Sequence, residues 1–192
     1  MQRTMFNTPI ISHLLYAFSA LVLKLTGWRA EGEFPKHIPK AMVIAAPHTT
    51  NWDMPFSLMI AFKLRIPVYW MGKSSIFNFP FGPIMRWMGG IPVERSRSTN
   101  TVDAIIEKFN QNDRLHIMMA PEGTRSKVKE WKSGFYHMAN GANVPIVLAY
   151  IDYANKRGGI GPVYQTSGDY EKDLAEIKAF YQPFSGKFNS SN

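Results

Sequence analysis

The chain has 192 residues, 45% of them hydrophobic, which is enough for one domain with a sizeable core and too little for two full domains. It carries 22 Lys and Arg against 14 Asp and Glu, and this net charge of +8 favours anionic partners such as lipid headgroups, nucleic acid, phosphorylated substrates or an acidic carrier protein. The absence of cysteine excludes a thiolate nucleophile, a cysteine-ligated zinc ion and a disulfide framework.

The first expected element is a helix over residues 8–26, with Thr8 as its N-cap, Pro9 at its first position and Gly27 as its stop. Its most apolar stretch, residues 10–23, is shorter than the ~20 residues that a membrane-spanning helix needs. The helix therefore either packs in the core or lies in a membrane interface.

A position in the membrane interface is favoured over one in the core, because a terminal helix has little protein on which to pack. In the interface, Lys24, Trp28 and Arg29 would lie at the level of the lipid headgroups. We expect residues 1–30 to form an amphipathic, membrane-interface unit.

The segments that follow alternate between strands and helices. Strands are expected at 41–46, 66–71, 91–94, 114–120, 144–151 and near 160–166, and helices at 51–64, 83–88, 99–112, 133–141 and 169–182. This order predicts an α/β fold with a mostly parallel central sheet flanked by helices. We expect the domain to span residues 31–186 and a flexible tail to occupy 187–192.

A polar cluster, "PHTTNWD", follows the strand at 41–46. Asp53 comes five residues after His48 across a strand-to-helix turn, so its carboxylate can reach back to one imidazole nitrogen. The other nitrogen would then face the site, which is the arrangement that a general base needs. The alternative is that Asp53 only caps its helix.

A second cluster, "EGTRS", follows the strand at 114–120. Its glycine allows close approach of the backbone, and Arg125 offers a planar fork for a phosphate. Because ligand sites in such sheets lie outside the carboxyl ends of the strands, the two clusters should share one edge of the sheet. The sequence contains no nucleophile elbow and no P-loop, and its histidines are too scattered to predict a metal site.

Together these segments resemble the glycerophospholipid acyltransferases of the 1-acyl-glycerol-3-phosphate acyltransferase type. The resemblance covers residues 41–150 and consists of four blocks in the family's order. The matching residues are His48 to Asp53; Lys73, Gly82, Gly90, Val93 and Arg95; Pro121 to Ser126; and Val144 to Val147. The chain departs from the family at Ser75-Ile76, where Glu-Leu is common, and at Leu148, where a second proline is common.

The resemblance implies a membrane-associated O-acyltransferase of phospholipid biosynthesis, peripheral to the cytoplasmic face of the membrane. It would move a fatty acyl group from acyl-CoA or acyl carrier protein to the hydroxyl of a lysophospholipid such as 1-acyl-glycerol-3-phosphate, without a resident cofactor. His48, oriented by Asp53, would take the proton of the hydroxyl, and no acyl-enzyme would form. The implied substrate-binding residues are Lys73, Arg95, Glu122, Gly123, Thr124 and Arg125.

Alternatives remain open at two points. The acceptor could be a lyso-ornithine lipid, another lysolipid or glycerol 3-phosphate, and the fold could serve as a non-catalytic membrane-binding module. The Phe- and Met-rich residues 76–88 could line a channel for the acyl chain or belong to the core. A nucleic-acid binder is disfavoured, because the aromatic residues concentrate in apolar segments.

Overall fold

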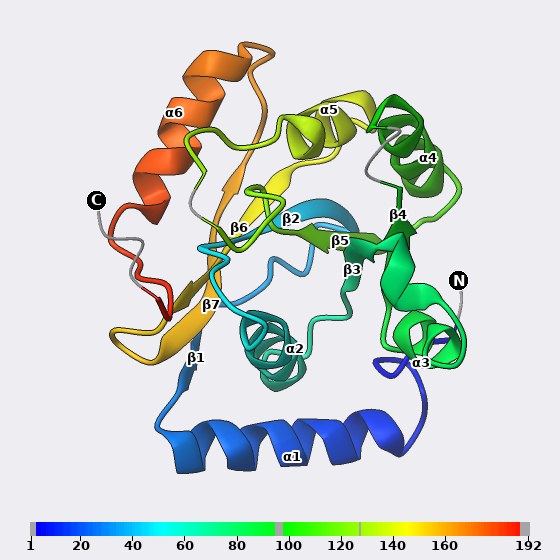
Figure 1. The fold of residues 1–192 in the computed structure, drawn as a ribbon, viewed down its shortest axis with the longest axis vertical. Coiled ribbons are helices and arrows are strands. Elements are labelled where there is room, and N and C mark those ends of the chain that lie inside the picture. The colour runs from blue at the N-terminus through cyan, green and yellow to red at the C-terminus, as the bar shows by residue number, and fades with distance from the viewer. Residues whose placement is uncertain (1–2, 95–97, 127, 189–192) are drawn as a thin grey trace.

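The computed structural model describes residues 3–94, 98–126 and 128–188, and a central sheet organises this part of the chain (Figure 1). Its strands are β1 Arg29–Glu31, β2 Lys40–Ala46, β3 Tyr69–Lys73, β4 Gly90–Val93, β5 Leu115–Met119, β6 Ile146–Asp152 and β7 Arg157–Tyr164. They lie in the order β1-β7-β6-β2-β5-β3-β4. Every neighbouring pair is parallel except β6 and β7, so the predicted α/β class with a mostly parallel sheet is confirmed.

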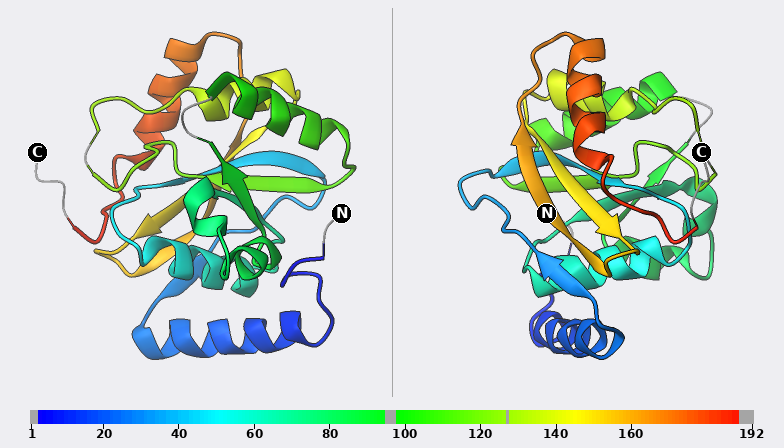
Figure 2. Two further views of the ribbon diagram at one scale, coloured as in Figure 1. Left: turned by 45° about the vertical axis from the view of Figure 1, so that its right-hand side comes forward. Right: turned by 90° about the vertical axis from the view of Figure 1, so that its left-hand side faces the viewer.

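Helices cover both faces of this sheet. They are α1 Ile11–Thr26, α2 Asp53–Lys63, α3 Gly82–Trp87, α4 Ser98–Asn110, α5 Gly134–Gly141 and α6 Tyr170–Tyr181, with a short 3-10 helix, η1, at Ser74–Phe77. Figure 2 shows α4, α5 and α6 on one side of the sheet, and α2 with α1 beneath it on the other.

Strand β2 shows why the sheet needs helices on both faces. Met42 and Ile44 are fully buried and pack in the core cluster that includes Phe135 of α5. Ala41 and Val43 alternate with them and are buried on the opposite face. A strand buried on both faces reads as the continuous apolar run seen in the sequence.

The N-terminal helix begins at Ile11, so the expected start near residue 8 and the expected cap are wrong. The hydroxyl of Thr8 donates a hydrogen bond to the carbonyl of Thr4 at 2.6 Å, within a turn that precedes the helix. The same oxygen accepts from the indole Nε1 of Trp87 at 3.3 Å, and no side chain among the described residues caps the first helical amides. Gly27 ends the helix in the left-handed conformation (φ 76), as predicted.

Helix α1 is buried along one side and exposed along the other. Leu23 packs against Trp28, Ile60 of α2 and Ile151 at the end of β6. The side that faces solvent carries a row of apolar side chains, Leu14, Phe18, Leu21 and Leu25. Within the described residues, no helix has the length and hydropathy required to cross a bilayer.

Two strands, β3 and β7, start about three residues away from their expected positions, and the predicted boundary between the first two units falls in a strand. Strand β3 starts three residues later than expected, because Arg65 (φ 56) and Pro67, which has no amide hydrogen, turn the chain after α2. Strand β7 starts earlier than expected, at Arg157. The predicted boundary between residues 30 and 31 lies inside β1, which pairs with β7. The division into an N-terminal unit, a domain and a tail remains a prediction.

Candidate active site

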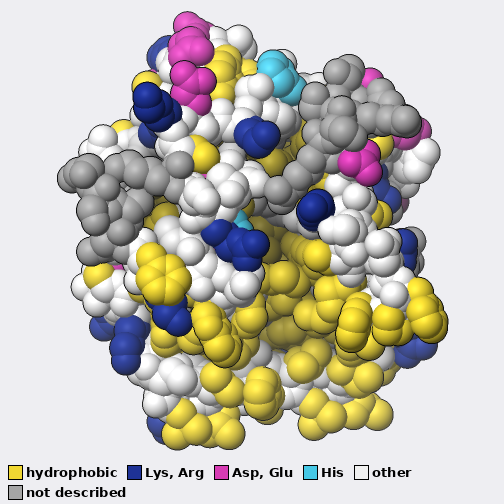
Figure 3. All heavy atoms as spheres, in the orientation of Figure 1, with side chains coloured by type: hydrophobic (Ala, Val, Ile, Leu, Met, Phe, Trp, Pro, Cys, Tyr) yellow, Lys and Arg dark blue, Asp and Glu magenta, His cyan; other side chains and the backbone are white. Residues whose placement is uncertain are grey.

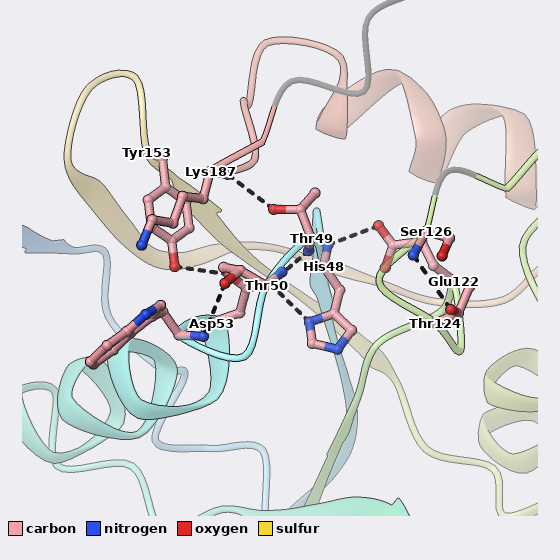
Figure 4. Close-up of polar contacts among 10 residues, drawn as sticks. His48, Thr49, Thr50, Asp53, Glu122, Thr124, Ser126, Tyr153 and Lys187 are labelled. Carbon is pink, nitrogen blue, oxygen red and sulfur yellow. Dashed lines mark hydrogen bonds and ion pairs between the residues drawn. The ribbon is translucent and has the colours of Figure 1, made fainter.

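A histidine and an aspartate meet where β2 gives way to α2. His48 lies in the loop after β2, and Asp53 is the first residue of α2. The Nδ1 atom of His48 is 2.9 Å from Oδ2 of Asp53 (Figure 4). Asp53 is 4% exposed, whereas 28% of the His48 side chain reaches solvent. The spacing of the two residues therefore predicted their contact correctly.

Four donors surround the Asp53 carboxylate. Its Oδ2 accepts from Nδ1 of His48 and from the backbone N–H groups of Thr49 (2.7 Å) and Thr50 (2.9 Å), and its Oδ1 accepts from the hydroxyl of Tyr153 (2.8 Å). Burial raises the pKa of Asp53, but these hydrogen bonds outweigh it and hold the pKa below its usual value. An ionised carboxylate only accepts, so Nδ1 of His48 carries the hydrogen and a neutral ring keeps its lone pair on Nε2.

Tyr153 was not predicted from the sequence. It follows β6, which lies beside β2 in the sheet, so its side chain arrives at the same edge as His48 and Asp53. Its ring also packs edge-on against Trp28, with the ring centroids 5.0 Å apart. The sequence signal that could have indicated Tyr153 was its position directly after β6, because the neighbouring strand β2 is followed by the polar cluster that holds His48 and Asp53.

Glu122 links the two polar clusters. Its Oε1 accepts a hydrogen bond from the backbone N–H of His48 at 3.0 Å, so the loops after β2 and β5 meet as predicted. Its Oε2 is buried and has no hydrogen-bond partner among the described residues. Burial raises the pKa of this carboxyl above its usual value. Glu122 therefore holds the loop that carries His48.

His48 lies between two cavities. The smaller, of about 320 Å³, is also lined by Asp53, Lys73, Thr124 and Arg125. The cationic side chains of Lys73 and Arg125 suit an anionic group such as a phosphate, and Asp53 is the only carboxylate among the described residues of this lining. In Figure 4 the second ring nitrogen of His48 points away from Asp53, toward the space between the two loops.

The larger cavity, of about 700 Å³, has both apolar and charged residues in its lining, and the charged ones include Glu94, Asp103 and Lys132. Met71, Met119, Trp131 and Met138 contribute to it together with His48. Gly123, with φ 66, also borders this cavity, and a side chain there would collide with Lys132. A long apolar group can lie here within reach of the imidazole.

The structure brings together five of the six predicted substrate-binding residues. Lys73, Thr124 and Arg125 line the smaller cavity, Gly123 borders the larger one, and Glu122 holds the backbone of His48. The sixth, Arg95, lies outside the described residues. Their roles in binding remain predictions.

The fold and the site define an α/β protein that has a histidine–carboxylate pair at the carboxyl edge of a mostly parallel sheet. The family model described as Acyltransferase matches residues 29–152, and the chain belongs to this family.

Several relatives share one name. The chain is 30% identical over 152 residues to the 1-acyl-sn-glycerol-3-phosphate acyltransferase of Haemophilus influenzae, an alignment that covers 74% of this chain and 61% of that protein. It is 32% identical over 111 residues to the Escherichia coli protein of the same name, which covers 55% of this chain and 44% of that protein. The chain thus spans less than two thirds of the length of these relatives.

One solved structure shares the fold. It is the 1-acyl-sn-glycerophosphate (LPA) acyltransferase PlsC from Thermotoga maritima, which matches 95% of this chain and 87% of that chain with a TM-score of 0.63. The two sequences are 16% identical over this match, so the likeness is one of architecture.

Proposed function

We propose that this protein transfers a fatty acyl group from an acyl thioester to the free hydroxyl of a lysophospholipid, with 1-acyl-glycerol-3-phosphate as the acceptor. The observation that carries the proposal is the 2.9 Å contact between Asp53 and Nδ1 of His48, which leaves Nε2 free beside both cavities. Family membership and the shared name of the relatives support the same chemistry.

In this mechanism His48 moves one proton twice. Its Nε2 takes the proton of the acceptor hydroxyl while the oxygen attacks the thioester carbonyl, and Asp53 stabilises the resulting imidazolium. When the tetrahedral intermediate collapses, the carbon–sulfur bond breaks and the imidazolium returns its proton to the leaving thiolate. The products are the ester and a free thiol, and no acyl-enzyme is required.

The two cavities fit the two substrates. Lys73 and Arg125 in the smaller cavity would bind the phosphate of the acceptor, close to His48. A lyso-ornithine lipid would offer these cations only a carboxylate, so an acceptor that carries phosphate is favoured. The larger cavity, whose lining includes Met71, Met119 and Trp131, would hold the arm of the acyl thioester.

Acyl-CoA and acyl carrier protein are both strongly anionic, and both suit the net charge of +8. No resident cofactor is needed for the chemistry. The exposed apolar row of α1, which ends near Lys24, would hold the protein on the cytoplasmic face of a membrane as a peripheral enzyme.

The test is a thiol-release assay on the purified protein, with acyl-CoA and acyl carrier protein as donors and a panel of lysolipids as acceptors. Release that requires 1-acyl-glycerol-3-phosphate, and that falls by about 10²–10⁴ in His48→Ala, supports the proposal. His37→Ala, which changes an exposed histidine that lines neither of these cavities, is the matched control. Undiminished turnover in His48→Ala would show that His48 is not the base. Release that requires a different lysolipid would show that the acceptor is not 1-acyl-glycerol-3-phosphate.

A further inference from the structure

Between β3 and β4 the chain presents apolar side chains to solvent at a fixed turn. Ile76, Phe79, Phe81 and Ile84 are 43%, 95%, 63% and 52% exposed. We call residues 76–84 the aromatic loop. The expectation that residues 76–88 are core or channel is therefore wrong for Phe79 and Phe81, because they project beyond the surface that the loop covers.

The base of the aromatic loop is anchored while its tip is free. Phe77 is 5% exposed and stacks on Trp70, with the ring centroids 5.7 Å apart. The guanidinium of Arg86 lies 5.6 Å from the centroid of the Phe77 ring, and the N–H of Gly82 donates to the carbonyl of Asn78 at 2.9 Å. The loop is thus held in place, so the exposed rings project from a supported turn.

The aromatic loop shares one face of the molecule with α1. Figure 3 shows apolar side chains gathered over the half of this view that contains α1 and α3, and continuing into the central hollow. On α1 the exposed members of this apolar face recur every three or four residues, at Leu14, Phe18, Leu21 and Leu25. A continuous exposed apolar surface of this kind marks a site of interaction.

The charge pattern indicates what covers this surface. Residues 1–30 and 54–93, which contain α1 and the aromatic loop, include no Asp or Glu. The first segment carries three Lys or Arg residues and the second carries four. All 14 acidic residues lie elsewhere in the chain, and those visible in Figure 3 lie mainly over α6 and α4. Two segments that hold apolar side chains and cations, and no Asp or Glu, match an anionic lipid surface.

We propose that the aromatic loop inserts into the headgroup region of an anionic phospholipid bilayer, as a second contact beside α1. Phe and Leu on the apolar face of interfacial segments lie at the boundary between the headgroups and the acyl chains, where an apolar ring exchanges contact with water for contact with lipid. Attraction between an acidic carrier protein and these cations would not by itself account for Phe79, an apolar ring that is 95% exposed.

This placement gives the site an opening to the membrane. Ile76 is exposed on the aromatic loop and also lines the smaller cavity, together with His48. A lysolipid could therefore pass sideways from the bilayer to the base, without its acyl chain crossing water. Only this passage rests on the proposed function, whereas insertion of the loop does not.

The chain has no cysteine, so one label can be placed at will. Phe79→Cys carrying an environment-sensitive fluorophore is mixed with vesicles of phosphatidylcholine and phosphatidylglycerol, without any substrate. We expect a blue shift, and quenching by nitroxides placed on the lipid acyl chains. The control is Val163→Cys, an exposed apolar position on β7 near α6, at which neither change is expected (Figure 1).

A second measurement uses the unlabelled protein. Phe79→Ser with Phe81→Ser should weaken vesicle binding by about tenfold or more, whereas Val163→Ser should leave it unchanged. Unchanged binding in the double variant, or a label at residue 79 that stays in water on bound vesicles, would overturn the proposal. So would a blue shift that appears with acyl carrier protein or rising protein concentration instead of vesicles. Normal insertion without any acyl transfer would contradict the proposed function alone.

Discussion

The hydroxyl of Tyr153 donates a 2.8 Å hydrogen bond to Oδ1 of Asp53, although 100 residues separate the two in the chain. The bond joins the end of β6 to the start of α2, so the carboxylate that orients His48 is held from two elements. Tyr153 touches neither cavity and acts through Asp53, which makes it a positioning residue. Burial, followed by the hydrogen bond to Asp53, raises the pKa of Tyr153 well above its usual value, so the phenol stays a donor throughout the neutral range.

The first prediction concerns this bond. Tyr153→Phe keeps the ring that packs on Trp28 but removes one of four donors to Asp53, so kcat/KM should fall by about tenfold. Because hydrogen bonds hold the pKa of Asp53 down, the loss of one should raise that pKa. The acid limb of the pH–rate profile should therefore move to higher pH.

The matched control for this variant is Tyr164→Phe, which removes a hydroxyl bonded to Asp173 and Glu176, away from His48. It should leave the pH profile where it is. If Tyr153→Phe lowers the rate without moving the acid limb, its role is structural and the positioning argument is wrong.

The second prediction separates the two substrates. Arg125→Ala removes a cation from the smaller cavity, so the KM for the phosphate-bearing acceptor should rise by about tenfold or more, while the KM for the acyl thioester should change little. Steady-state kinetics with each substrate varied in turn measure both values. Lys129→Ala, an exposed cation on the same loop, is the control for a general effect of charge. A rise confined to the KM of the thioester would assign the smaller cavity to the donor.

The third prediction concerns stability at a buried carboxylate remote from the site. Asp173 is fully buried, and its oxygens accept hydrogen bonds from Tyr136, Tyr164 and both the N–H and hydroxyl of Ser167. Burial raises its pKa, but these bonds lower it to about 2. Asp173→Asn turns one acceptor into a donor that faces donors, and should cost about 2–3 kcal/mol of unfolding free energy at pH 7.

The pH dependence follows from the sign of the shift. A pKa that is lower in the folded state stabilises the protein above the unfolded value of 3.8, and this stabilisation is lost as the pH falls toward 2. Denaturant unfolding of the unchanged protein and of Asp173→Asn should therefore give a difference in unfolding free energy that is constant near neutrality and becomes smaller below pH 4. If this difference in unfolding free energy were as large near pH 2 as at pH 7, the charge of the Asp173 carboxylate would not contribute to stability.

The sequence by itself determined what depends on neighbours along the chain. His48 and Asp53 are five residues apart across one turn, and a turn of that length brings the carboxylate to the ring. The alternation of apolar strands and helices fixed the fold class, because a sheet buried on both faces needs helices on both sides. Since parallel strands end at one edge, the meeting of the loops that hold His48 and Glu122 also followed.

Only the tertiary structure decided which distant groups complete the site and which apolar side chains face outward. Tyr153 reaches Asp53 because β6 lies beside β2, and strand order is set by the packing of the whole sheet. The aromatic loop has the composition of a core segment, yet Phe77 is buried and Phe79 is not. Burial depends on whether another part of the chain covers a side chain, and a local pattern of residues does not contain that information.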